Sequence, residues 1–379
     1  MQVKADIIVI GAGIAGTSAA AALARSANII VLDQEAQAGY HSTGRSAATW
    51  APYYGPDIIR FLTAASIATL SKPEANFADQ PFTCKRGEMM LGREGDEADI
   101  EHHKLMGMDS LSLSDARALV PLLKDSVKHI LYTDNMLGID VDALHQAFIR
   151  KIKSNSSQII VNQKVVAMEY SDNRWHITTP TTCYQTPIVI NAAGAWADSI
   201  AALAGVTPVG LQPKRRSAAL APYAEGENMP DWPMIFGAGE SFYCTPFGNG
   251  MMISPADETP VDPHDVWPED IDIATGIDLF QQHIDYDFKS VIHQWAGLRT
   301  FAPDGNPVVG FDNNLPGFFW LAGQGGYGIQ TSPALAALCR ELIYPDSGTS
   351  NGFFTEPEIT DLRYKLSPAR YNPDQSLNS

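Results

Sequence analysis

The stretch KADIIVIGAGIAGTSAAAALARSANIIVLD, residues Lys4–Asp33, decides the fold of this chain. Its β-branched run Lys4–Ile10 is typical of a parallel strand buried on both faces. The alanine-rich run Thr17–Ala27 has strong helix propensity, and the apolar run Asn28–Asp33 predicts a second buried strand. Strand, turn, helix and strand in this order form one βαβ unit of a doubly wound sheet. We therefore expect an α/β fold, α+β overall.

Three glycines, Gly11, Gly13 and Gly16, separate the first strand from the helix. In this motif the first glycine permits a tight turn, the second lets backbone approach a pyrophosphate, and the third lets helix and strand pack closely. The helix N-terminus then faces the phosphates with its partial positive charge. Asp33 ends the second strand, where an acidic residue holds a ribose. The spacing predicts a Rossmann-like dinucleotide-binding domain.

Composition and charge exclude several classes of function. The chain has 379 residues, 45% hydrophobic and 18% charged, a globular balance that excludes disorder and fibrous repeats. A net charge of −17 argues against a nucleic-acid partner. Glycines interrupt the apolar run Ile7–Ala24, so we expect no transmembrane segment and no signal peptide. The four cysteines form no CxxC pair, so we expect no metal site and a cytoplasmic enzyme with reduced thiols.

The glycine motif does not decide between NAD and FAD, but two other features favour FAD. A polar loop, Gly39–Ser46, directly follows the second strand and leads into Ala47 and Ala48, small residues that let backbone amides meet a flat ring. A nicotinamide dehydrogenase more usually continues into another βα unit. The block Gln324–Ser332 precedes the last predicted helix, and clustered glycines there form an anion nest that would stabilise a reduced flavin. A glycine-rich loop without a ligand is the alternative for this block.

Longer motifs show a resemblance to a known family. The chain resembles the FAD-dependent amino-acid oxidoreductases of the D-amino-acid oxidase and glycine/sarcosine oxidase type, and more narrowly the D-arginine dehydrogenases. The matching motifs are GYHSTGRSAA (Gly39–Ala48), DALHQ (Asp142–Gln146), NAAGAW (Asn191–Trp196), LQPKRRSA (Leu211–Ala218), DWPM (Asp231–Met234), ESFY (Glu240–Tyr243), WAGLR (Trp295–Arg299) and QGGYGIQTS (Gln324–Ser332). Some family members tether flavin through a cysteine. No cysteine here lies in a matching motif, so the resemblance implies non-covalent FAD.

The resemblance also implies how the chain is divided. We expect a discontinuous FAD-binding domain from residues 1–50, 141–205 and 300–345, a mixed-sheet substrate-binding domain from 51–140 and 206–299, and a loose C-terminal extension, 346–379. The implied cofactor contacts are Gly11, Gly13, Ile14, Ala15, Gly16, Asp33, Gln34, Ser42, Thr43, Gly44, Arg45, Ser46, Ala47, Ala48, Val165, Ala193, Gly194, Trp196, Arg299, Gly325, Gly326, Tyr327, Gly328, Ile329 and Gln330.

The activity implied is oxidative deamination of a D-amino acid. A hydride leaves Cα for flavin N5, and the imino acid hydrolyses to a 2-oxo acid and ammonia. The implied substrate site consists of Tyr54, Glu88, Arg216, Tyr243, Arg299 and Gly326. Arg299 would grip the substrate carboxylate in two bonds, with a further bond from the Tyr243 hydroxyl. The carbonyl of Gly326 would accept a bond from the amine.

Strand alternation and the resemblance give the remaining roles. Alternation places Lys214 and Arg216 on one face of a strand and Arg215 on the other. Tyr54 matches a loop tyrosine that covers bound substrate.

Glu88, if it faces the pocket, would pair with a cationic side chain such as that of arginine. Thr49 stands where the family has a histidine beside the substrate. The expected preference is therefore for basic D-amino acids or for a broad range of them.

Three other functions stay open at this stage. The first is a glycine/sarcosine-type FAD amine oxidase, against which Glu88 argues because a small substrate leaves that carboxylate without a partner. The second is a non-catalytic flavin-binding electron-transfer partner, and the third a nicotinamide-dependent dehydrogenase. The sequence does not set the electron acceptor, oxygen or a quinone-like carrier.

Overall fold

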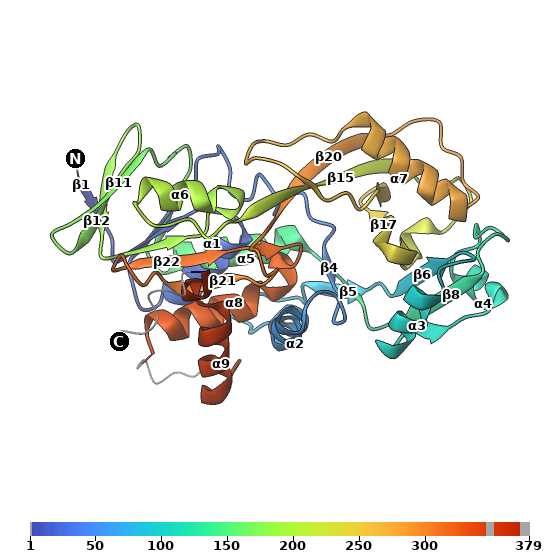
Figure 1. Ribbon diagram of the computed structural model, residues 1–379, viewed down its shortest axis with the longest axis horizontal. Coiled ribbons are helices and arrows are strands. Elements are labelled where there is room, and N and C mark those ends of the chain that lie inside the picture. The colour runs from blue at the N-terminus through green and yellow to red at the C-terminus, as the bar shows by residue number, and fades with distance from the viewer. Residues whose placement is uncertain (1, 346–351, 372–379) are drawn as a thin grey trace.

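The computed structural model describes residues 2–345 and 352–371, and two large sheets dominate it (Figure 1). The first has six strands in the order β10 (Gln158–Ile160), β3 (Ile29–Leu32), β2 (Ile7–Ile10), β14 (Ile188–Asn191), β22 (Phe318–Ala322) and β21 (Val308–Phe311). Neighbouring strands are parallel except β21, which runs antiparallel to β22. The predicted doubly wound sheet is confirmed.

The βαβ unit at the N-terminus forms as the sequence predicts. β2 and β3 pair in parallel, and both are buried along their whole length. The alanine-rich α1 (Ile14–Leu23) joins them and packs in one core with α5 (Val141–Ser154) and α8 (Gly328–Ile343). Its alanine side chains let α1 lie close to its neighbours, because they add little bulk between backbones.

The second large sheet is mixed, as expected. Its strands run in the order β23 (Gln324–Gly325), β20 (His293–Phe301), β15 (Gln212–Pro222), β18 (Gly250–Ser254), β17 (Tyr243–Phe247), β16 (Met234–Gly237), β6 (Glu88–Gly92), β8 (His129–Thr133) and β7 (Asp109–Ser110), and β19 (Thr259–Pro260) also pairs with β15. The pair β16–β6 is parallel and the other pairs are antiparallel. Figure 1 shows this sheet extending away from the first one.

Smaller elements complete the two halves. A four-stranded sheet contains β1 (Gln2–Lys4), β13 (Cys183–Thr186), β12 (Arg174–Thr178) and β11 (Ala167–Ser171). A three-stranded sheet contains β4 (Thr49–Trp50), β9 (Leu137–Ile139) and β5 (Thr83–Lys85). Four further α-helices are α3 (Glu97–Leu105), α4 (Leu113–Leu119), α6 (Ala197–Leu203) and α7 (Asp270–His283). A short 3-10 helix, η1 (Gly194–Trp196), precedes α6.

The helix α2 (Asp57–Ser71) lies in the stretch expected to belong to the substrate half. Its buried residues Leu62 and Leu70 join the core around the first sheet, where α2 packs against α8. The division of the chain at residues 51, 141, 206 and 300 stays a prediction.

The expectation of a loose C-terminal extension is wrong for residues 352–371. Helix α9 (Glu356–Leu366) begins with a capping box between Thr355 and Glu358. It buries Ile359, Leu362 and Leu366 in the core around the first sheet. These apolar residues are spaced three and four apart among charged ones, so a helical stripe is hidden in a polar stretch. Residues 346–351 and 372–379 lie outside the described residues.

Candidate active site

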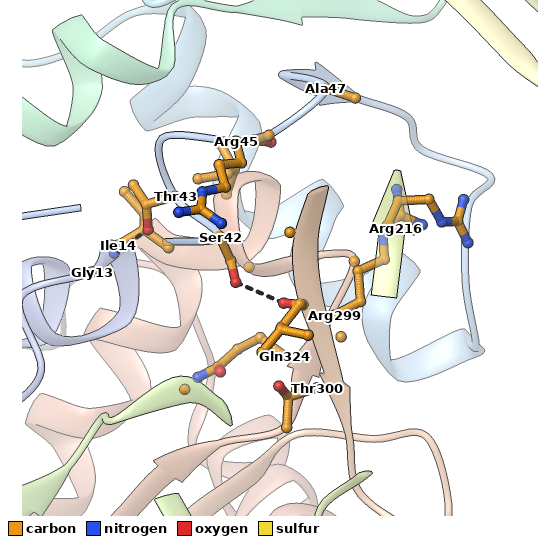
Figure 2. A pocket seen from close by; sticks show the side chains of 18 of the residues that line it. Gly13, Ile14, Ser42, Thr43, Arg45, Ala47, Arg216, Arg299, Thr300 and Gln324 are labelled. Atoms are coloured by element: carbon orange, nitrogen blue, oxygen red, sulfur yellow. Dashed lines mark hydrogen bonds between the residues drawn. The ribbon is translucent and has the colours of Figure 1, made fainter. Parts of the chain in front are cut away.

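A cavity of about 970 Å³ joins the two halves of the molecule. It extends from the glycine turn before α1, past the loop after β3, to β15 and β20 of the mixed sheet, and Figure 2 shows part of its wall. All six predicted substrate residues line it: Tyr54, Glu88, Arg216, Tyr243, Arg299 and Gly326. The chain therefore brings together residues far apart in sequence around one large space.

Most of the predicted cofactor contacts also line this cavity. They are Gly11, Gly13, Ile14, Ala15, Asp33, Gln34, Ser42, Thr43, Arg45, Ser46, Ala47, Ala48, Val165, Ala193, Gly194, Trp196, Arg299, Gly325, Gly326, Gly328, Ile329 and Gln330. Gly16, Gly44 and Tyr327 do not line it. A Cβ on Gly16 would collide with the carbonyl of Gly11, so this glycine serves the packing of α1 on the turn.

The glycine turn has the backbone shape that a pyrophosphate site needs. Gly11 has φ +107°, a conformation that favours glycine, and a Cβ there would collide with the carbonyl of Ala192. Gly13, Ile14 and Ala15 at the start of α1 line the cavity. The positive end of this helix therefore faces the space where a pyrophosphate would lie.

Side chains hold this turn from two directions. The Ile14 amide donates to Thr43 Oγ1 at 2.9 Å, and the Ala12 amide donates to Asp33 Oδ2 at 2.6 Å. Burial raises the pKa of Asp33, although two backbone amides bind its carboxylate. A carboxylate offers about four acceptor positions, so Asp33 keeps capacity for the hydroxyls of a ribose.

The buried His145 is a residue to which the sequence analysis assigns no role. Its Nε2 lies 3.0 Å from the carbonyl of Ala12, and because a carbonyl only accepts, Nε2 carries the hydrogen. Its ring also meets the backbone of Gly39, where a Cβ would lie 2.8 Å from Cε1. Burial lowers the pKa of His145. The signal in the sequence was the DALHQ motif, which places a polar residue beside the apolar stripe of α5.

The loop after β3 is fastened to the strand that carries Arg299. The Ser42 hydroxyl donates to the Leu298 carbonyl at 2.6 Å, the bond drawn in Figure 2. The Arg45 guanidinium donates to the Ala296 carbonyl at 2.9 Å and to Asp265 Oδ1 at 2.6 Å. The cofactor loop and β20 therefore form one connected wall of the cavity.

The block Gln324–Ser332, which leads into α8 and includes its first turn, supplies unpaired donors. Gly325 has φ +55°, and a Cβ there would collide with the ring of Phe301. Gln330 accepts the Ala51 amide at 3.0 Å, but among the described residues its buried Nε2 and that of Gln324 have no partner. Both glutamines line the cavity. Buried amide donors need acceptors, and the carbonyl and ring nitrogen atoms of a flavin fit that need.

Arg299 lines the cavity together with Tyr54. Its Nη1 donates to the Tyr54 hydroxyl at 3.0 Å, and the Tyr54 ring meets Tyr327 edge-on at 5.0 Å. Burial acts to lower the pKa of Arg299, but Tyr54 and Tyr243 outweigh it and the pKa is raised. Within the described part of the chain, no carboxylate lies within ion-pair distance of Arg299. A charged guanidinium thus lines the cavity without an anionic partner.

Arg216 is already engaged by its neighbours. Its Nε donates to the Asp257 carbonyl at 2.8 Å, and its Nη2 donates to Glu258 Oε1 at 2.9 Å. The guanidinium also lies 5.9 Å from the centre of the Tyr243 ring.

The two faces of β15 differ as strand alternation predicts. Lys214 shares Glu258 with Arg216, whereas Arg215 binds Glu269 and Asp272 of the α7 region. Glu258 also lines the cavity and was not predicted from the sequence.

Glu88 begins β6 of the same mixed sheet and lines the cavity. Burial, with a smaller effect from Glu240, raises its pKa to about 7. Among the residues that the structure describes, its carboxylate makes no hydrogen bond or ion pair. Glu88 is therefore an acid that changes charge near neutral pH and has room for a partner.

Neither a metal-binding cluster nor a membrane-spanning helix occurs among the described residues. Within 2–345 and 352–371, no group of three or more His, Cys, Asp and Glu side chains is placed to hold a metal ion. In the same ranges, no helix has the length and apolar character needed to cross a bilayer.

Comparison with known proteins agrees with this geometry. The sequence profile of the family described as "FAD dependent oxidoreductase" (DAO) matches residues 6–342. Mitochondrial sarcosine dehydrogenase of Mus musculus is 26% identical over 250 residues, which are 60% of this chain and 26% of that protein. The match thus covers about a quarter of that relative's length. Glycine oxidase of Bacillus licheniformis is 21% identical over 361 residues, covering 90% of this chain and 94% of the relative.

The fold has close counterparts among solved structures. L-proline dehydrogenase from P. horikoshii superposes with a TM-score of 0.78 at 22% identity and covers 99% of each chain. This likeness concerns the fold, and it agrees with the two-sheet arrangement around the cavity. The cofactor of this chain is FAD, and the glycine turn, Asp33 and the unpaired glutamine amides fit it. The chain belongs to the FAD-dependent oxidoreductase (DAO) family.

Proposed function

We propose that this protein oxidises D-amino acids to imino acids, preferring basic side chains such as that of D-arginine or accepting a broad range. The observation that carries the proposal is Arg299, a charged guanidinium that lines the cavity without an anionic partner among the described residues. Such a fork binds a carboxylate in two parallel bonds. An amino acid held there would have its Cα beside the cofactor part of the cavity.

The residues around Arg299 support an amino acid as the substrate. Tyr54 already bonds Arg299 through its hydroxyl, so a bound carboxylate would meet a donor pair rather than a single side chain. Tyr243 and Gly326 line the same space, and they supply a second hydroxyl and a backbone carbonyl for the amine. When bound, FAD supplies the acceptor for the hydride that leaves Cα. The chain's own residues bind the carboxylate and orient Cα.

Glu88 supports a cationic side chain in the preferred substrate. Its carboxylate has no partner within the described ranges and is half-buried in the cavity wall. A guanidinium or ammonium arriving there would pair with a charge that is poorly solvated, which strengthens the attraction.

Two further parts of the proposal concern the cofactor and its surroundings. Non-covalent FAD is part of the proposal, and the structure supports it as far as cysteine is concerned: all four cysteines lie in described residues and none lines the cavity. Electrons pass from the reduced flavin to oxygen or to a quinone-like carrier. The predicted cytoplasmic location is part of the same proposal.

Anaerobic reduction of the bound flavin tests the proposed activity. The purified yellow protein is mixed without oxygen with D-arginine, D-lysine, D-methionine, their L-enantiomers, glycine and sarcosine. We expect D-amino acids to bleach the flavin absorbance, the basic ones at the lowest concentrations. A flavin that no amino acid or amine reduces would contradict catalysis and favour an electron-transfer protein.

The second candidate function is a glycine/sarcosine-type amine oxidase. It is favoured by the glycine oxidase relative, whose match covers 90% of this chain. In the same experiment, reduction by sarcosine or glycine without reduction by any D-amino acid would replace the first proposal with this one.

A further inference from the structure

Glu258 links Lys214 and Arg216, two cations that lie on the same face of β15. One carboxylate oxygen accepts from Lys214 Nζ at 2.8 Å and the other accepts from Arg216 Nη2 at 2.9 Å. Register fixes this arrangement, because β19 pairs with β15 and places residues 259 and 260 opposite Arg215 and Lys214. Glu258 itself is partly exposed, with 43% of its side chain accessible, and it lines the cavity.

Arg216 and Arg299, two of the four arginines that line the cavity, therefore differ in what they can bind. Arg216 has two of its three nitrogens engaged, Nε by the Asp257 carbonyl and Nη2 by Glu258. Arg299 donates only to the neutral hydroxyl of Tyr54 among the described residues. A substrate carboxylate that approaches Arg216 must compete with a carboxylate already bonded to it, whereas among the described residues no carboxylate lies within ion-pair distance of Arg299.

We propose that Glu258 is a positioning residue that sets the charge class of the substrate. It neutralises Arg216 and Lys214, so that Arg299 remains the cation available to a substrate anion and amino acids with a single carboxylate are selected. The inference rests on the proposed function, since it assumes that Arg299 holds the substrate carboxylate. The role of Glu258 concerns the charge of the substrate's side chain, whereas Arg299 binds the carboxylate that all amino acids share.

The electrostatics near Glu258 explain why a dicarboxylate is disfavoured. Burial opposes ionisation, but the bond from Lys214 and the charges of Arg216 and Arg299 outweigh it and lower the pKa of Glu258. The carboxylate is thus charged at neutral pH. A second substrate carboxylate in this region would be repelled by it and would find the neighbouring cations occupied.

Replacing Glu258 with glutamine tests this role, because Gln has the same shape without the charge. Rates of anaerobic flavin reduction are measured with D-aspartate and D-methionine in the wild type and E258Q. We expect the ratio of kcat/KM for D-aspartate to that for D-methionine to rise about tenfold in E258Q, mainly through a lower KM. An unchanged or lower ratio would overturn the proposal.

Glu269→Gln is the matched control, because Glu269 pairs with Arg215 on the opposite face of β15. It removes the same kind of ion pair, and we expect it to leave the ratio unchanged. An equal rise in both variants would show a general effect of charge and would also overturn the proposal.

A second variant and a binding measurement keep the test independent of folding and of turnover. Lys214→Met removes one of the two cations that neutralise Glu258. We therefore expect the ratio of kcat/KM for D-aspartate to that for D-methionine to fall, and a rise would overturn the proposal. Binding of succinate and butyrate is followed by the perturbation of the flavin spectrum, and E258Q should gain affinity for succinate relative to butyrate.

If sarcosine but no D-amino acid reduces the wild type, the proposed function fails. The role of Glu258 is then decided by the ratio of kcat/KM for iminodiacetate to kcat/KM for sarcosine. E258Q should raise this ratio in the same way.

Discussion

Glu88→Gln removes a carboxylate from the cavity wall while keeping its size. The burial that raises the pKa of Glu88 to about 7 disfavours its charged form, so the acid is largely neutral below that pH and largely ionised above it. A pKa of 7 leaves about a tenth of the residue ionised at pH 6 and about nine tenths at pH 8. If the ionised form binds a cationic side chain, the wild-type kcat/KM for D-arginine relative to D-methionine should rise about tenfold over this range.

The variant should abolish this rise and lower the ratio at pH 8. Removing one partner of a half-buried ion pair costs about 2 kcal/mol of binding free energy, which corresponds to about a 30-fold loss in kcat/KM. The assay is anaerobic flavin reduction with both substrates at pH values from 6 to 9, since the comparison cancels the ionisation of the substrate amine that both share. Glu240→Gln serves as a companion variant: because Glu240 contributes to the raised pKa, its removal should move the midpoint of the profile below pH 7.

Two results would refute this reasoning. One is an equal loss of activity with D-arginine and D-methionine in Glu88→Gln, which would mean that the carboxylate shapes the cavity without contacting the side chain of the substrate. The other is a wild-type substrate ratio that stays flat from pH 6 to pH 8.

Three further changes test other parts of the structure. Arg299→Ala should lower kcat/KM at least 100-fold for every reactive substrate in the reduction assay, because about 3 kcal/mol or more of charge-assisted bonding is lost, and near-normal activity would contradict its role as anchor. His145→Ala should raise the Kd for FAD about tenfold, measured by quenching of flavin fluorescence in the apoprotein, because the Ala12 carbonyl loses its donor. His145→Gln should restore part of the affinity for FAD. His283→Ala, at an equally buried histidine, should leave that affinity unchanged. If both alanine variants raise the Kd equally, His145 has no specific role in holding the glycine turn. Leu362→Ala should lower the free energy of unfolding by about 3 kcal/mol in urea titrations, and a loss below 0.5 kcal/mol, roughly that of a surface site, would contradict the packing of α9.

Local patterns predicted the nucleotide half of the molecule well. Strand, glycine turn, alanine-rich helix and acidic residue lie within Lys4–Asp33, and each has its own physical requirement at its own position. The resemblance then pointed to Arg299 and Glu88, which do line one cavity. Their roles toward a substrate stay predictions.

Other features depend on contacts between distant segments, which a single sequence does not reveal. Glu258 lies in an ordinary polar loop, and only the pairing of β19 with β15 brings it to Arg216. His145 needs the packing of α5 under the glycine turn to reach Ala12. Tyr327 fell outside the cavity because its ring packs on Tyr54 and against Gly55. In each case the pattern identified a polar or aromatic residue, and tertiary packing decided what it touches.

The bonds from Ser42 and Arg45 to β20 have a consequence for the position of Arg299. Swinging the two halves apart would break both attachments and move Arg299 away from the ring. The segment Ala51–Gly55 is held as well. The Ala51 amide donates to Gln330 Oε1 and the Gly55 carbonyl accepts from Arg60, while the hydroxyls of Tyr53 and Tyr54 accept from Asn135 and Arg299. The proposed substrate anchor is thus braced directly against the loop that lines the cofactor region, so the separation between the two is set by hydrogen bonds across the cavity wall.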